Sequence, residues 1–204
     1  MSDPIIVEWV QRALDGDQDA FAELVYAHQD AVYNLCYRML GTTAEAEDAT
    51  QEAFLRAYIN LARYDTGRSF KTWVMSIASN HCIDRIRRRR MQLLSLDEPL
   101  SNDDQLALSS KDDLPETFAL RRETESEIQA LLDELQPDYR AAVVLRYWYD
   151  YSYTEIADAL NTSESAIKSR LFRARQMLAD RLSSQQQRQS NSPQLGDSLR
   201  GRNR

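Results

Sequence analysis

The side chains that most often perform catalysis or bind metals are scarce in this sequence. It has two cysteines, Cys36 and Cys82, and two histidines, His28 and His81, and these do not follow the spacing of a zinc site. It contains no glycine-rich phosphate loop and no nucleophile elbow. We therefore expect a protein that is not an enzyme and has no metal, cofactor or small-molecule substrate. Both cysteines are interpreted as small core residues in a reducing cytoplasm.

A run of arginines is the first group that could bind a ligand. Arginine stands at five of the six positions 85–90, at the C-terminal end of an expected helix over 70–90. Arginines there complement the helix dipole, but five of them exceed that need. The phosphates of a nucleic acid are the natural partner for such a cluster.

The segment 152–182 has the pattern of a helix-turn-helix. Ser152 and Glu155 have the spacing of a capping box that opens a short helix, and Asn161 suits the left-handed geometry of the turn. A second helix is expected from 162 or 163 to about 182. At 100° per residue its apolar stripe comprises Ile167, Leu171, Ala174, Leu178 and Leu182.

The opposite face of this second helix is polar but carries one aromatic residue, Phe172. An aromatic ring off the apolar stripe needs a partner, and a thymine methyl group in a DNA major groove would provide one. A face that is merely solvated is the alternative. The expected contacts to bases or phosphates come from Ser165, Lys168, Ser169, Phe172, Arg173 and Gln176.

Composition predicts an all-α fold, because five glycines and five prolines in 204 residues are too few for the tight turns of a β protein. Helical patterns define two small domains, 1–90 and 116–182, joined by a flexible acidic linker, 91–115. The tail 183–204 is expected to be disordered. Residues 91–125 carry nine acidic and three basic groups, and so supply most of the net charge of −7. Both domains are nearly balanced, which leaves room for local basic surfaces.

The sequence predicts a cytoplasmic protein with no direct membrane insertion. It has no apolar window of the roughly 18–20 residues that a membrane span needs. The N-terminus is polar and acidic and does not have the pattern of a signal peptide.

Two segments in this order resemble the sigma-70 family of RNA polymerase sigma factors, in its extracytoplasmic-function (ECF) group. Region 2 is similar to DAFAELVYAHQDAVYNLCYRMLGTTAEAEDATQEAFLRAY, followed by FKTWVMSIASNHCIDRIRRRR. Region 4 is similar to LDELQPDYRAAVVLRYWYDYSYTEIADALNTSESAIKSRLFRARQML. A short linker with no further domain also fits this group.

The resemblance implies a role for each surface. The helix-turn-helix would read the −35 promoter element. Region 2 would read and open the −10 element through a loop and a basic helix end, with Tyr64 and Phe70 as stacking platforms and the other contacts from Asp65, Thr66, Arg68, Arg85, Arg88 and Arg89. An acidic stripe would dock on the β′ coiled coil of core RNA polymerase, and it comprises Glu45, Asp48, Gln51 and Glu52. Part of LRYWYD would meet the β flap.

The implied function is promoter-specific transcription initiation with core RNA polymerase and promoter DNA as partners. An anti-sigma factor is a further partner in many relatives, although no residue here identifies one. Two alternatives remain open at this point. One is a helix-turn-helix regulator that acts without polymerase, which leaves the first domain unexplained. The other is a helical adaptor that binds only proteins.

Overall fold

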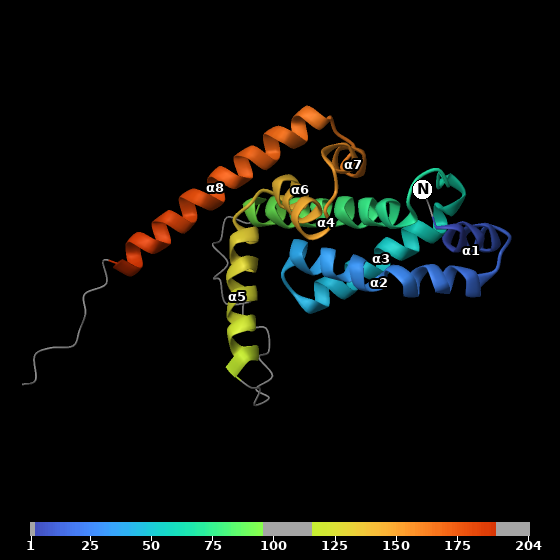
Figure 1. Cartoon of the computed structure of the whole chain (residues 1–204), viewed down its shortest axis with the longest axis horizontal. Helices are drawn as coiled ribbons and strands as arrows, with labels where there is room; N and C mark the ends of the chain where they lie inside the picture. The colour runs from blue at the N-terminus through green and yellow to red at the C-terminus, as the bar shows by residue number, and fades with distance from the viewer. Residues whose placement is uncertain (1–2, 96–115, 191–204) are drawn as a thin grey trace, which may run out of the picture.

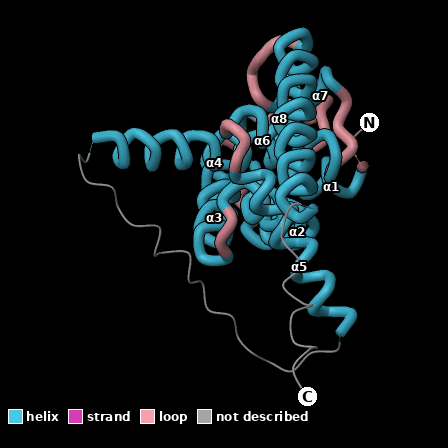
Figure 2. The backbone as a smooth tube through the Cα atoms, turned by 90° about the vertical axis from the view of Figure 1, so that its left-hand side faces the viewer, coloured by secondary structure: helices cyan, strands magenta, loops and turns pink. Residues whose placement is uncertain are grey.

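The computed structural model describes residues 3–95 and 116–190, and their regular structure is helical throughout, as predicted (Figures 1 and 2). In chain order the elements are α1 (Pro4–Leu14), α2 (Gln18–Leu40), α3 (Thr43–Ile59), the 3-10 turn η1 (Leu61–Arg63), α4 (Phe70–Ser95), α5 (Glu116–Asp133), α6 (Pro137–Trp148), α7 (Tyr153–Ala159) and α8 (Glu164–Ser190). None of the described helices is long and apolar enough to cross a membrane.

Helices α1–α4 pack on one another and form the first module. The Asp17 side chain caps α2 by accepting a hydrogen bond from Ala20 N at 3.1 Å. Gly41 ends the same helix with a φ of 86°, a left-handed conformation that glycine adopts without strain. These local signals set the length of α2 and the sharp turn into α3.

One face of α3 is a stripe of four alanines, Ala46, Ala49, Ala53 and Ala57, and all four are fully buried. Small side chains let the α3 backbone lie close to its neighbours, and α3 packs against both α2 and α4. The alanine stripe is therefore the face of α3 that packs against the rest of the first module.

The two cysteines meet inside the first module. Cys36 of α2 and Cys82 of α4 are both fully buried and free of disulfides. Their thiols are joined by a hydrogen bond, and this bond together with burial raises the pKa of Cys82. Both are core residues, as the sequence predicts.

Helices α5–α8 form the second module, in which α6, α7 and α8 pack on one another. The predicted capping box of α7 is present, because Ser152 Oγ accepts from Glu155 N at 3.2 Å and Glu155 Oε2 accepts from Ser152 N at 2.8 Å. Asn161 has a φ of 48° in the turn before α8, as expected for a helix-turn-helix.

The two modules pack together, with α6 on α2 and α4, and α7 on α4. At the contact between the modules, side chains of the second module donate hydrogen bonds to the carbonyls at the C-terminal end of α2. Arg140 Nη1 donates to Met39 O at 2.6 Å, and Gln129 Nε2 donates to Arg38 O at 3.2 Å. These carbonyls have no partner within their own helix, so the second module satisfies them. Arg140 is 6% exposed and also pairs with Asp133 at 2.8 Å.

Two predicted boundaries need correction. Helix α4 continues to Ser95, beyond the expected end at Arg90. Helix α8 continues to Ser190, although disorder was expected from residue 183. The added residues are Met, Gln, Leu and Ser in α4 and Ser, Gln and Arg in α8, and these extend an established helix at little cost per residue. The rest of the predicted linker, 96–115, and of the tail, 191–204, lies outside the described residues.

His28 is expected to make the stability of the first module depend on pH. Its ring stacks on Phe70 with centroids 5.4 Å apart, and burial, followed by the charge of Lys71, lowers the pKa of His28 below its ordinary value of 6.5. The unfolded chain therefore binds more protons below about pH 6.5, so the free energy of unfolding should fall as the pH drops from 7 to 5. Urea denaturation should show a smaller fall for His28→Gln than for the wild type. An equal fall in both proteins would contradict this assignment.

Candidate nucleic-acid interface

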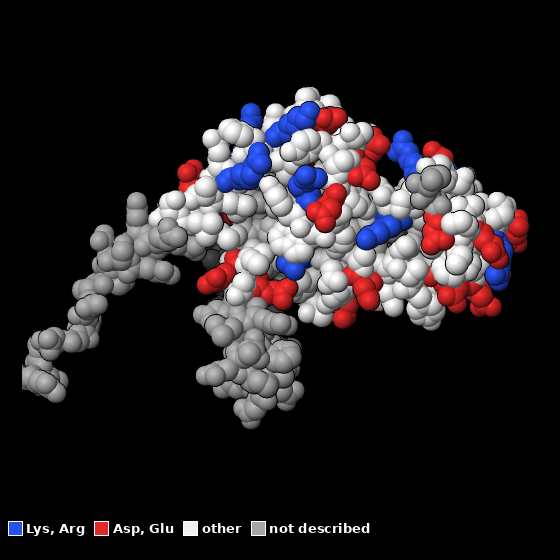
Figure 3. Space-filling view, viewed as in Figure 1, with Lys and Arg blue, Asp and Glu red and all other residues white. Residues whose placement is uncertain are grey.

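The outer face of α8 borders an open groove of about 670 Å³, lined by Tyr153, Lys168, Ser169, Phe172, Arg173, Arg175 and Gln176. Five of the six residues predicted on this face line the groove. The sixth, Ser165, is exposed one turn earlier, with its hydroxyl 3.0 Å from that of Ser163. On the face seen in Figure 3, basic side chains gather over the N-terminal half of α8. The groove therefore combines basic side chains with an aromatic ring.

The groove follows from how α8 is anchored. Ile167, Leu171 and Ala174 are buried against the module, which turns Phe172 outward with 54% of its surface exposed. The apolar stripe predicted from the sequence extends to Leu182, but Leu182 is exposed, so the buried part of the stripe ends before it. An outward phenylalanine on a rigid helix is available for a partner.

Two groove residues escaped the sequence prediction. Tyr153 opens α7, and two cations lie over its ring: the guanidinium of Arg146, 5.4 Å from the ring centroid, and the ammonium of Lys168, 5.7 Å from it. Arg175 was not among the predicted contacts, but it is exposed and lines the groove. Angular position on one helix could not reveal Tyr153, because that residue comes from the neighbouring helix.

Lys168 is partly neutralised by its own helix. Its ammonium lies 2.6 Å from Glu164 Oε1, and the hydrogen bond in this pair raises the pKa of Lys168 and lowers that of Glu164. Arg173 lies 3.4 Å from the Tyr139 hydroxyl and forms no ion pair within the described residues. Arg173 is thus the better placed of the two to meet a base or phosphate.

The predicted stacking platforms need correction. Phe70 is 1% exposed and Tyr64 is 8% exposed, and their rings meet edge to face at 5.5 Å. Trp73 completes the cluster at 5.0 Å from Tyr64 and 5.6 Å from Phe70. Rings packed in this way have no free face for a base. The sequence places both aromatic residues beside the loop, but it does not reveal that their rings are buried beneath it.

The loop above these rings exposes the other predicted residues, Asp65, Thr66 and Arg68. Asp65 Oδ1 accepts a hydrogen bond from Gly67 N at 2.9 Å, which closes a local turn. Arg68 lies 3.8 Å from Asp65 and 3.6 Å from Asp158 of α7. The loop therefore touches the second module at its tip.

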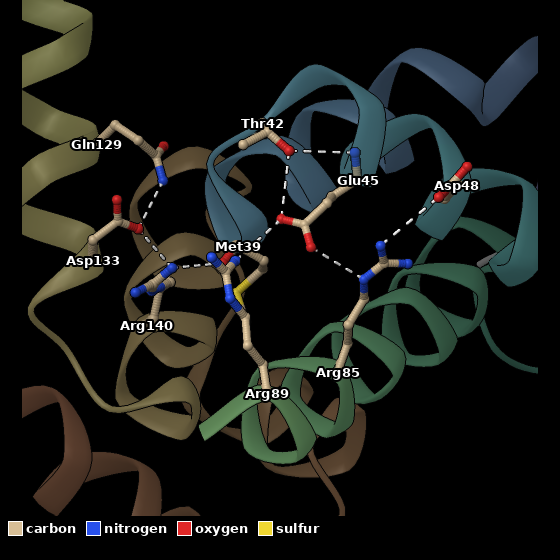
Figure 4. A network of polar contacts seen from close by, with 9 residues as sticks. All are labelled: Met39, Thr42, Glu45, Asp48, Arg85, Arg89, Gln129, Asp133 and Arg140. Atoms are coloured by element: carbon tan, nitrogen blue, oxygen red, sulfur yellow. Dashed lines mark hydrogen bonds and ion pairs between the residues drawn. The ribbon is translucent and has the colours of Figure 1, made fainter. Parts of the chain in front are cut away.

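The arginine run at the end of α4 is divided between several partners (Figure 4). Arg85 lies 3.4 Å from Glu45 and 3.7 Å from Asp48, and Arg89 lies 3.6 Å from Glu45. Arg87 lies 2.6 Å from Asp138 of α6. Within the described ranges, ion pairs are found for neither Arg88 nor Arg90, and both are exposed. The C-terminal end of α4 also stands out from the bundle (Figure 2).

The acidic stripe on α3 is only partly a free surface. Asp48 is 68% exposed at its side chain, and Gln51 is exposed beside it. Glu52 is held by Arg56 at 2.6 Å, and this hydrogen bond lowers the pKa of Glu52. Glu45 turns toward α4 and keeps only 24% exposure, which corrects its predicted place on the docking face.

An apolar extension of the α3 face was missed, although its helical spacing is visible in the sequence. It comprises Leu55 and Ile59, which are both exposed. No group of three or more His, Cys, Asp or Glu among the described residues is placed to hold a metal. The surfaces described here suit binding to a polyanion and to a basic protein partner.

Comparison with known proteins agrees with this geometry. Residues 24–91 match the family described as Sigma-70 region 2, and residues 125–178 match Sigma-70 region 4. The ECF RNA polymerase sigma factor SigW of Bacillus subtilis (strain 168) is 38% identical over 182 residues, which cover 87% of this chain and 97% of that protein. The ECF RNA polymerase sigma-E factor of Escherichia coli (strain K12) is 30% identical over 186 residues, covering 89% and 95%.

A solved structure shares the fold. CnrH in complex with the cytosolic domain of CnrY superimposes with a TM-score of 0.63 at 24% identity, over 89% of this chain and 99% of that chain. The two family matches occur in the order expected from the sequence, and the relatives are matched over nearly their whole length. The chain therefore belongs to the ECF group of sigma-70 RNA polymerase sigma factors, non-enzymatic initiation factors that bind RNA polymerase and DNA and direct promoter recognition.

Proposed function

We propose that the groove on α8 reads the −35 element, with Phe172 against a thymine methyl group or sugar and Arg173 on a base edge or phosphate. The exposed Phe172 ring, flanked by Lys168 and Arg173 in one groove, is the observation that carries this assignment. Tyr153 and Arg175 extend the groove and would contact the DNA backbone.

The first module would read the −10 element through the exposed loop residues Asp65, Thr66 and Arg68. The end of α4 would hold backbone phosphates, with Arg88 open and Arg85 and Arg89 released from their acidic partners. The buried Tyr64 and Phe70 would shape this loop from within.

Docking on core polymerase would use the exposed face of α3. Asp48, Gln51 and Glu52 suit a basic partner such as the β′ coiled coil, and Leu55 and Ile59 add apolar area beside them. The exposed Tyr147 in the LRYWYD segment is a contact for the β flap.

An anti-sigma factor is a further proposed partner. One structural neighbour, the sigma factor RpoE of Bartonella quintana, was crystallised in complex with the anti-sigma factor NepR. We also propose that the protein works in the cytoplasm, where polymerase and promoters are found.

Transcription in vitro tests the −35 assignment. Arg173→Ala should lower promoter-specific transcription by about 5–150-fold, equivalent to roughly 1–3 kcal/mol, because one base or phosphate contact is lost. Affinity for core polymerase should stay unchanged. Arg181→Ala is the matched control, since Arg181 lies on the same helix outside the groove and pairs with Glu134 at 2.6 Å. Equal transcription from both variants would show that the DNA face of α8 is misassigned.

A further inference from the structure

We propose that Glu45 is a positioning residue that masks the basic end of α4 in the free protein. In this proposal its carboxylate occupies Arg85 and Arg89 in place of DNA phosphates, and the two arginines reach DNA only when the carboxylate releases them. The inference rests on the proposed DNA role of the arginine run and adds its regulation. It makes polymerase docking and DNA contact depend on the same ion pairs.

Two arginines, Arg85 and Arg89, contact the same Glu45 carboxylate, one at each oxygen (Figure 4). Glu45 Oε1 lies 3.4 Å from Arg85 Nε, and Glu45 Oε2 lies 3.6 Å from Arg89 Nη1. Arg85 and Arg89 are four residues apart on α4, so both side chains leave the same face of the helix. Arg85 has a second acidic partner, because its Nη2 lies 3.7 Å from Asp48 Oδ2.

The local structure of α3 keeps the Glu45 carboxylate in this place. Glu45 lies in the first turn, where the helix dipole favours a negative charge. Thr42, the N-cap residue, accepts a hydrogen bond from Glu45 N at 3.3 Å and donates its hydroxyl to Glu45 Oε2 at 3.4 Å. With 24% of its side chain exposed, the carboxylate is partly desolvated and favours its cationic neighbours.

Carboxylate and phosphate oxygens compete for the same guanidinium donors. In the free protein the run therefore offers Arg88 and Arg90 to DNA, whereas Arg85 and Arg89 are occupied. This masking weakens binding to DNA away from polymerase. It adds to the repulsion from the net charge of −7.

The mask connects directly to the proposed docking face. Asp48 is the most exposed member of that face and is also a partner of Arg85. A basic polymerase surface that binds the Asp48 carboxylate would break the ion pair between Asp48 and Arg85. By linkage, release of the arginines to phosphate makes Asp48 more available to polymerase in return. Docking and DNA binding therefore favour each other through these residues.

Fluorescence anisotropy with a labelled non-promoter duplex and the full chain without polymerase tests the proposal. Glu45→Gln keeps the size of the side chain but removes the charge, so it should raise DNA affinity about threefold or more at 50 mM salt. Two released arginines should also steepen the slope of log affinity against log salt by about one to two. Removing the arginines in the same background (Glu45→Gln with Arg85→Ala and Arg89→Ala) should cancel the gain.

Glu47→Gln is the matched control. Glu47 is exposed on the same helix, forms no ion pair within the described residues, and its substitution makes the same change in net charge. It should leave the salt slope unchanged. Equal effects of Glu45→Gln and Glu47→Gln would overturn the proposal, because bulk charge would then explain both.

A further variant separates the failure of this inference from the failure of the proposed function. Arg88→Ala should lower DNA affinity, since Arg88 is already open. If it does and Glu45→Gln behaves like Glu47→Gln, only the mask is wrong. If Arg88→Ala has no effect, the DNA role of the run fails and the mask fails with it. Should Glu45→Gln fold poorly by circular dichroism, Glu45→Ala removes the same carboxylate from Arg85 and Arg89, and an unchanged salt slope there would overturn the proposal.

Discussion

Phe70→Ala is expected to lower the free energy of unfolding by about 3–5 kcal/mol, the range for removing a buried phenylalanine. Phe70 is 1% exposed, and its ring touches those of His28, Tyr64 and Trp73. The truncation leaves a cavity directly below the proposed −10 loop. Urea denaturation measures the loss.

Phe70→Leu separates a packing role from a stacking role. Leucine keeps most of the apolar volume, so the stability loss should shrink to roughly 1–2 kcal/mol. Promoter opening, measured by in vitro transcription at a temperature where the variant stays folded, should then be close to that of the wild type. A large loss of opening in a folded Phe70→Leu protein would restore the ring as a platform for a base.

Arg140→Ala should lower the free energy of unfolding by about 2–3 kcal/mol and loosen the joint between the modules. The substitution removes the charged donor to Met39 O and leaves that buried carbonyl without its partner. It also removes the pair with Asp133. Solution scattering should report a larger radius of gyration.

Arg146→Ala is the control on the same helix. The Arg146 guanidinium donates to Tyr151 O at 2.8 Å, within the second module. Its loss should cost stability without changing the radius of gyration. If both variants keep the wild-type radius, the Arg140 bond does not hold the modules together.

Local patterns were sufficient to predict much of this protein. The caps at Asp17, Gly41 and Ser152 depend on neighbours within a few residues in the sequence, so their geometry follows from residue type. The apolar stripe that includes Ile167 orients α8, and this orientation exposes Phe172. Such features need no knowledge of the rest of the chain.

Apart from the ends of α4 and α8, the errors concern contacts between distant segments. Tyr64 and Phe70 flank a polar loop, and only the packing of α2 and α4 shows that their rings point inward. Glu45 belongs to an acidic stripe by angle, but a helix 40 residues later supplies its partners. Arg140 looked like any helix arginine, because the carbonyl it caps lies 101 residues away. Periodicity within one helix carries no information on these partners.

The alanine stripe of α3 has a consequence for recognition. Four buried side chains without rotatable χ angles fix the helix against its neighbours, and no rotamer has to be frozen on that side when a partner binds. The opposite face is thus presented on a backbone that is already ordered. A protein docking there meets a preorganised surface, so the conformational entropy that this helix loses on association comes from its exposed side chains and not from its backbone.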